Sequence, residues 1–82
     1  MLTVSVVSPE RTLFEGEAEA IVAPAFDGQV GILTDHAPML TLLGNGELRL
    51  TASGGDRTFK VSGGFLEVAD NRVRIVTERA EG

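Results

Sequence analysis

The stretch TFKVSGGFLEVADNRVRIV, residues 58–76, alternates apolar and polar side chains and is interrupted by Ser-Gly-Gly and by Asp-Asn. A period of two is typical of a β-strand with one buried face, because successive side chains point to opposite sides of a sheet. Residues 62–64, SGG, are expected to lie between two strands, and Asp70-Asn71 tolerates the positive φ angles of a tight hairpin turn. The stretch therefore predicts antiparallel strands joined by short turns.

The same alternation continues toward the N-terminus, in residues 2–6, 17–23 and 47–51. The segment PMLTLL, residues 38–43, is too short for an ordinary helix and is expected to be another strand. Glycine-rich turns such as SGGD, residues 53–56, separate the strands at the spacing of an all-β sandwich or barrel. The residues predicted to form the buried face are Val4, Val6, Val22, Leu48, Leu50, Phe59, Val61, Val73 and Ile75.

Composition limits the protein classes that fit this chain. Its 82 residues predict a single domain, residues 1–82, and the net charge of −5 argues against a nucleic-acid partner. Cysteine is absent, so a disulfide framework or thiolate metal site is excluded. No apolar run reaches the roughly 18 residues that a membrane span needs, and we expect neither membrane insertion nor a secretory signal.

The sequence contains few residues that indicate a catalytic site or a cofactor-binding site. The only histidine, His36, has Asp35 as its neighbour, but adjacent residues on an extended chain point to opposite faces, so we expect no catalytic pair. DGQVG, residues 27–31, lacks the following helix that a phosphate-binding glycine loop requires. We therefore expect no enzyme activity, no cofactor and no metal. The long segment GQVGILTDHAP, residues 28–38, is instead typical of a binding loop.

Three ordered motifs resemble the epsilon subunit of F-type ATP synthases. They are VVSPERTLFEGE (6–17), DGQVGILTDHAPMLTLLGNGELRL (27–50) and SGGFLEVADNRVRIV (62–76), and together they span nearly the whole chain. The family's middle motif is close to DGE-GIL-GHAPL. This sequence departs from it at Gln29, where the family often has an acid, and at Thr34-Asp35, where it often has Pro-Gly.

The resemblance implies a flattened antiparallel β-sandwich of short strands at the foot of the rotor's central stalk. It implies a non-catalytic subunit of a hetero-oligomeric complex, which couples c-ring rotation to the gamma subunit and so proton translocation to ATP synthesis. The expected location is peripheral, on the cytoplasmic face of the bacterial inner membrane or its organellar equivalent. The loop expected to face the c-ring comprises Phe26, Asp27, Gly28, Gln29, Val30 and Gly31. The residues expected to face gamma are Ser8, His36, Ala37, Pro38, Met39, Leu40 and Thr41.

The family usually continues into a two-helix extension that restrains ATP hydrolysis, and this sequence stops near its start, at TERAEG (77–82). The chain is therefore expected to dock without inhibiting hydrolysis. The alternative hypothesis is a free-standing β-sandwich module that binds a ligand or another protein. Co-purification with gamma distinguishes the two, because only a rotor subunit should be recovered with it.

Overall fold

Strands make up all of the regular structure in the computed structural model, which describes residues 1–81. Their bounds are β1 (Leu2–Val7), β2 (Thr12–Ala18), β3 (Ala20–Ala25), β4 (Gly28–Leu33), β5 (Met39–Leu42), β6 (Asn45–Thr51), β7 (Arg57–Ala69) and β8 (Arg72–Glu81). The all-β fold class is confirmed, and so is the strand expected within residues 38–43. In this part of the chain no helix is long and apolar enough to cross a membrane.

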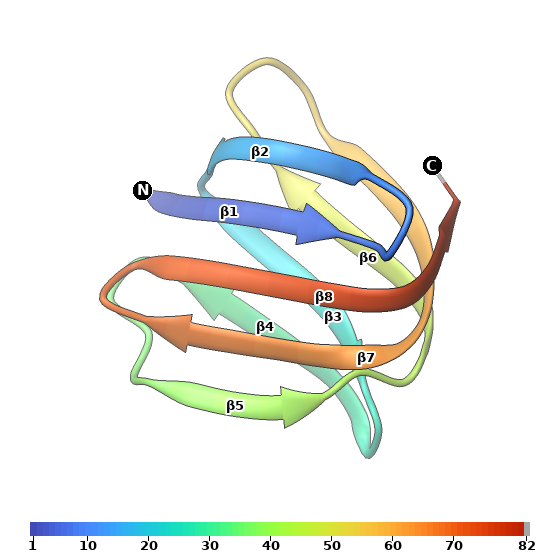
Figure 1. Cartoon of the computed structure of the whole chain (residues 1–82). Helices are drawn as coiled ribbons and strands as arrows, with labels where there is room; N and C mark the ends of the chain where they lie inside the picture. Colours follow the sequence, from blue (N-terminus) through green and yellow to red (C-terminus); the bar gives the residue numbers. More distant parts are fainter. Residues whose placement is uncertain (82) are drawn as a thin grey trace.

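The strands form one continuous sheet in the order β2-β1-β8-β7-β6-β3-β4, and β5 also pairs with β7. This sheet folds over on itself. In Figure 1 the front layer contains β2, β1, β8, the second half of β7 and β5, whereas β6, β3 and β4 lie behind it. Every strand pair is antiparallel except β1 with β8, which is parallel. The result is the predicted sandwich, with one parallel pair in its front layer.

Strand β7 belongs to both layers. Its first part, Arg57–Ser62, pairs with β6, and its second part, Phe65–Val68, pairs with β5. The change of layer falls at Gly63 and Gly64, whose φ angles are +70° and +106°. The expectation that these glycines lie between two strands is wrong. Left-handed glycine backbone bends the strand sharply without ending it, so both residues remain inside β7.

The core lies between the two layers and contains the inward-facing apolar residues of β1, β3, β4, β6, β7 and β8. Most of the predicted core is confirmed, because alternation assigns the faces correctly wherever a strand is regular. The predicted residues that are buried are Val4, Val6, Leu48, Leu50, Phe59, Val61, Val73 and Ile75.

The segment EAEAIVA, residues 17–23, contains two strands instead of the single strand predicted. Strand β2 ends at Ala18 and β3 begins at Ala20, with Glu19 between them. Ala18 is buried, but the buried positions of β3 are Ile21 and Ala23, and Val22 is 38% exposed. A one-residue shift at Glu19 sends every following side chain to the opposite face. The prediction that Val22 is buried is therefore wrong.

The hairpin turn expected at Asp70-Asn71 joins β7 to β8. Asp70 has φ 51° and Asn71 has φ 59°, as a type I′ turn requires at its two central positions. Asn and Asp adopt this left-handed conformation more readily than other residues with a side chain. The turn is thus a case in which local sequence chemistry predicted the backbone correctly.

Candidate protein-binding surface

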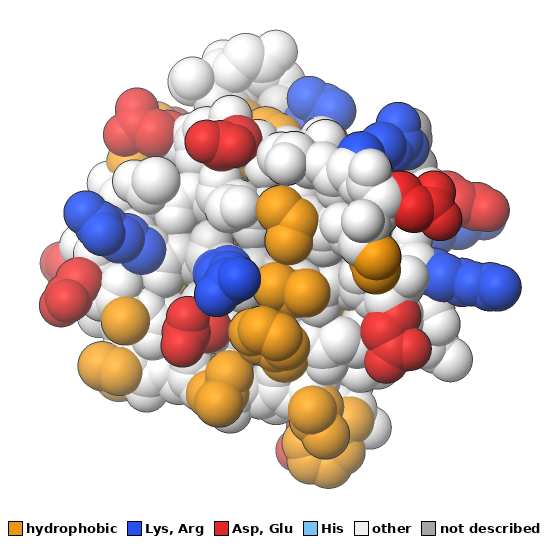
Figure 2. Space-filling model, viewed as in Figure 1, with side chains coloured by type: hydrophobic (Ala, Val, Ile, Leu, Met, Phe, Trp, Pro, Cys, Tyr) orange, Lys and Arg blue, Asp and Glu red, His pale blue; other side chains and the backbone are white. Residues whose placement is uncertain are grey.

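A row of apolar side chains crosses the outer face of the front layer. Its members are opposite one another in the strand register: Leu42 faces Phe65, Phe65 faces Val76, and Val76 faces Val7. Residues in register share a face of the sheet, and the neighbours Leu43, Leu66, Ile75 and Val6 point into the core. We call Leu42, Phe65, Val76 and Val7 the apolar row. Figure 2 shows apolar side chains gathered across the middle and lower part of this face.

Leu40 extends the apolar row along β5. It is 68% exposed and Leu42 is 61% exposed, which are high values for leucine. A shallow hollow beside them is lined by both leucines together with Phe65, Glu67 and Arg74. Exposed apolar residues gathered on one face of a folded domain make that face a candidate site of interaction.

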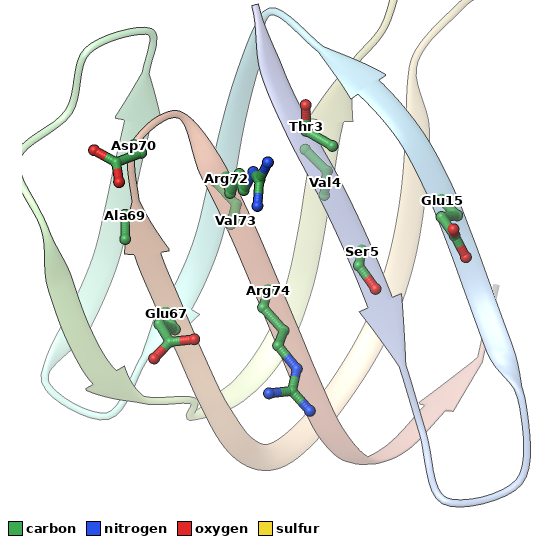
Figure 3. Close-up of a pocket in the computed structure, with 10 residues that line it drawn as sticks. All are labelled: Thr3, Val4, Ser5, Glu15, Glu67, Ala69, Asp70, Arg72, Val73 and Arg74. Carbon is green, nitrogen blue, oxygen red and sulfur yellow. The ribbon is translucent and has the colours of Figure 1, made fainter.

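A row of charged and polar side chains borders the apolar row. Glu67 faces Arg74 in the register, Arg74 faces Ser5, and Ser5 faces Glu15. These residues line a second shallow hollow, and Figure 3 shows them on β7, β8, β1 and β2 in turn. Glu67 and Arg74 are thus cross-strand neighbours of opposite charge, and such a pair stabilises a sheet by roughly 0.2–1 kcal/mol.

The apolar row was not predicted from the sequence, although the sequence carries a signal for it. Each member of the row has an apolar neighbour in the sequence, in the pairs Val6-Val7, Leu42-Leu43, Phe65-Leu66 and Ile75-Val76. Consecutive apolar residues place one side chain on each face of a strand. The register then brings the four outward members together, and register is a tertiary property that alternation along one strand does not reveal.

The residues expected to face gamma do not share one surface. Leu40, Ala37 and Pro38 are exposed, whereas Met39 packs against the core and Thr41 faces buried Leu66 across the sheet. Alternation along β5 explains this difference, because Leu40 and Leu42 occupy its outer face.

Ser8 and His36 lie at opposite ends of the front layer. Ser8 follows the end of β1, where its amide donates a hydrogen bond to the carbonyl of Arg11 at 2.9 Å. The segment around His36 lies near the start of β1, beside the turn between β7 and β8 (Figure 1). The apolar row crosses the face between these ends, and its last member, Val7, is the residue before Ser8.

The residues expected to form a c-ring-facing loop are mostly strand. Phe26 and Asp27 form the turn, and the remaining residues, from Gly28 to Gly31, begin the edge strand β4. Phe26 is 67% exposed at the tip of the hairpin, and its amide donates to the carbonyl of Leu42 at 3.1 Å. Gly28 has a φ of +133°, whereas Gly31 has no left-handed φ, so only the first of these two glycines has a backbone conformation that favours glycine.

His36 and Asp35 make separate hydrogen bonds. The ring Nδ1 of His36 lies 2.7 Å from the carbonyl oxygen of Ala37, and because a carbonyl only accepts, Nδ1 carries the proton. The Asp35 carboxylate accepts from the side-chain amide of Asn71 at 3.1 Å. Among residues 1–81, no group of three or more histidine, aspartate or glutamate side chains is placed to hold a metal ion.

The fold and the apolar row are typical of a β-sandwich domain that binds other proteins. The comparison with known families agrees with the β-sandwich fold. The chain belongs to the family of the β-sandwich domain of the ATP synthase delta/epsilon chain, whose model matches residues 1–82.

Its relatives are ATP synthase epsilon chains from bacteria and chloroplasts. The chain is 46% identical over 80 residues to that of Synechococcus sp., matching 98% of itself and 58% of the relative. It is 44% identical over 80 residues to the chloroplastic epsilon chain of Emiliania huxleyi, matching 98% of itself and 62% of the relative. The chain thus spans about three fifths of the length of these relatives. They are subunits of a membrane-associated complex.

Two solved ATP synthase structures contain chains with the same fold. One, from the Euglena gracilis mitochondrial complex with its c-ring, aligns with a TM-score of 0.89 at 26% identity over 98% of this chain and 52% of the other. The second, from the Tetrahymena thermophila mitochondrial central stalk and c-ring, aligns with a TM-score of 0.82 over 98% of this chain and 65% of the other. Its 18% identity supports the fold alone.

Proposed function

We propose that this chain is the docking domain of a non-catalytic central-stalk subunit in an F-type ATP synthase. It binds the gamma subunit and contacts the c-ring, so that ring rotation driven by proton translocation turns gamma and supports ATP synthesis. The complex lies at the cytoplasmic face of the bacterial inner membrane or its organellar equivalent. Family membership supports this function, and the observation that carries it is the apolar row on the front layer.

The apolar row suits a docking surface for gamma because it is continuous over β5, β7, β8 and β1. Burying it against a partner removes Leu40 and Leu42 from water, and each buried leucine contributes about 1.5–3 kcal/mol. The bordering charges, Glu67 and Arg74, would help to orient this domain on its partner, because charged residues at the rim of an interface contribute more to specificity than to affinity. Ser8 and the segment around His36 lie at the two ends of this surface.

The hairpin between β3 and β4 suits contact with the polar loops of the c-ring. Its tip presents the exposed residues Phe26, Asp27 and Gln29. The hydrogen bond from Phe26 to Leu42 joins this tip directly to the edge of the gamma-facing surface. The two partners therefore meet the domain at one shared corner, and rotation of the ring reaches gamma through a short path.

Disulfide cross-linking tests the two assignments. The chain has no cysteine, so Gln29→Cys or His36→Cys introduces a unique thiol. Position 29 is expected to cross-link to a cysteine in the c-ring loop, and position 36 to one in gamma, because each lies on the corresponding surface.

Asp56→Cys is the matched control for this experiment. It is exposed in the connection from β6 to β7, at the end of the domain away from the hairpin between β3 and β4 (Figure 1), and should cross-link to neither partner. If position 29 forms no disulfide with ring or gamma while the complex remains active, the hairpin assignment is wrong.

This chain is expected to bind ATP weakly or not at all and to hydrolyse none. Glycine loops bind phosphate through free amides at a helix N-terminus, whereas Gly28 and Gly31 lie in β4. Calorimetric titration of the chain with ATP measures the binding, with buffer injections as the control. A dissociation constant in the micromolar range would contradict the proposal of a non-catalytic docking domain without a nucleotide site.

A further inference from the structure

We propose that Asn71 is a positioning residue that holds the connection between β4 and β5 in the conformation that presents His36–Pro38 to the partner. This inference deepens the proposed function and rests on it. It concerns a contact between two turns that are distant in sequence, Thr34–Pro38 and Asp70-Asn71. The two turns lie together at one end of the front layer.

Two hydrogen bonds join these turns reciprocally. The backbone amide of Asp35 donates to Oδ1 of Asn71 at 2.6 Å, and Nδ2 of Asn71 donates to a carboxylate oxygen of Asp35 at 3.1 Å. The second bond has an ionised acceptor, and such bonds are stronger than neutral ones. One side-chain amide therefore satisfies both a backbone donor and a carboxylate of the same residue.

Asn71 meets two requirements that few residues combine. Its φ of 59° falls in the left-handed region, where asparagine, aspartate and glycine are the favoured residues. Glycine has no side chain to reach Asp35, and aspartate has no donor for its carboxylate. Asparagine alone among the three retains the turn and supplies both hydrogen bonds.

The connection between β4 and β5 needs such a support. It carries the chain from the back layer to the front layer and pairs with no strand. Asp35 has a φ of 67°, in the left-handed region that aspartate adopts more readily than most residues, and its two hydrogen bonds to Asn71 hold it in place. The backbone carbonyl of Asn71 also accepts from the amide of Thr3 at 2.8 Å. Asn71 thus ties the connection to the first residues of β1.

Asn71→Gly is the variant that tests this role, because glycine keeps the type I′ turn and removes the side-chain amide. Hydrogen exchange of the Asp35 amide, followed by NMR, is expected to accelerate about tenfold, as for loss of one hydrogen bond of ordinary strength. Affinity for ATP synthase from which epsilon has been removed is expected to fall about three- to tenfold, because the competent conformation is then only fractionally populated.

Asp70→Gly is the matched control, since it changes the adjacent residue of the same turn and leaves both hydrogen bonds intact. It should alter neither the Asp35 exchange rate nor the affinity. Asn71→Asp alone should impair both by placing two carboxylates together. Combining it with Asp35→Asn should restore both, because donor and carboxylate then exchange places at constant net charge. Such a rescue would show that the two side chains act through each other.

The outcomes separate the inference from the proposed function. If the Asp35 amide exchanges equally fast in the parent chain and in Asn71→Gly, the positioning role is wrong, whatever the chain binds. If exchange accelerates but the affinity is unchanged, Asn71 supports the turn without positioning the interface, and the inference is again overturned. If the parent chain fails to bind the depleted complex, the proposed function itself is wrong.

Discussion

Replacing Gly64 with alanine is expected to abolish cooperative folding of this domain. A Cβ atom at this position would overlap the carbonyl oxygen of Val76 and lie 2.8 Å from the Cα of Thr77, both backbone atoms of β8. The clash cannot be relieved by rotating a side chain, and Gly64 and Thr77 are paired in the register. The φ of +106° is also unfavourable for a residue with a Cβ atom.

The expected cost exceeds about 4 kcal/mol, because a backbone clash and an incompatible φ act together. A domain of this length has a total stability of about 4–12 kcal/mol, so the variant should be largely unfolded. Circular dichroism with urea titration measures the effect. Gly54→Ala is the control, because a Cβ atom there meets nothing within 4 Å and the backbone is not left-handed. A cooperative transition for Gly64→Ala within about 1 kcal/mol of the parent chain would contradict this account.

Replacing Leu40 and Leu42 together with glutamate is expected to remove docking on gamma and to preserve the fold. Both side chains are largely exposed, so the free domain loses little packing. At the proposed interface each leucine is worth about 1.5–3 kcal/mol, and the introduced charges would be buried without partners. Since about 1.4 kcal/mol corresponds to a tenfold change, affinity should fall at least about 100-fold.

Titration of the variant against ATP synthase depleted of epsilon measures this loss, and the urea midpoint verifies the fold. Leu33→Glu is the matched control. Leu33 is 64% exposed, close to the exposure of Leu42, but it lies on the back layer in β4. Equal loss of affinity for Leu33→Glu and for the double variant would show that the front layer is not the specific docking surface. Unchanged affinity of the double variant would exclude this surface altogether.

The sequence predicts most of this fold because its strands follow simple alternation. Val4 and Val6, or Val73 and Ile75, are assigned to the core by a period of two, and the φ angles of Asp70 and Asn71 follow from their residue types. Buried faces are predicted wrongly where the alternation of apolar and polar residues shifts by one position and no glycine or proline marks the shift. Glu19 is such a point, and it reversed the assignment of Val22.

The candidate surface is harder to predict for a related reason. Apart from Ser8, the residues expected from family resemblance lie in two short continuous segments, 26–31 and 36–41. The apolar row instead contains one residue from each of β1, β5, β7 and β8. Those residues meet only because of strand register, which depends on long-range pairing. The same holds for Asn71. Its turn can be predicted from the local sequence, but its contact with Asp35 depends on long-range pairing and cannot.

The passage of β7 from one layer to the other has a mechanical consequence. In an ordinary sandwich the two sheets are held together by side-chain contacts and can slide past each other under a lateral load. Here a lateral force on the front layer is transmitted through the backbone of β7 into the back layer. Both β6 and β8 are hydrogen-bonded to β7. Sliding would have to break several ladder hydrogen bonds at once. We therefore expect the domain to resist shear between its two layers, which would suit the torque-transmitting role proposed above.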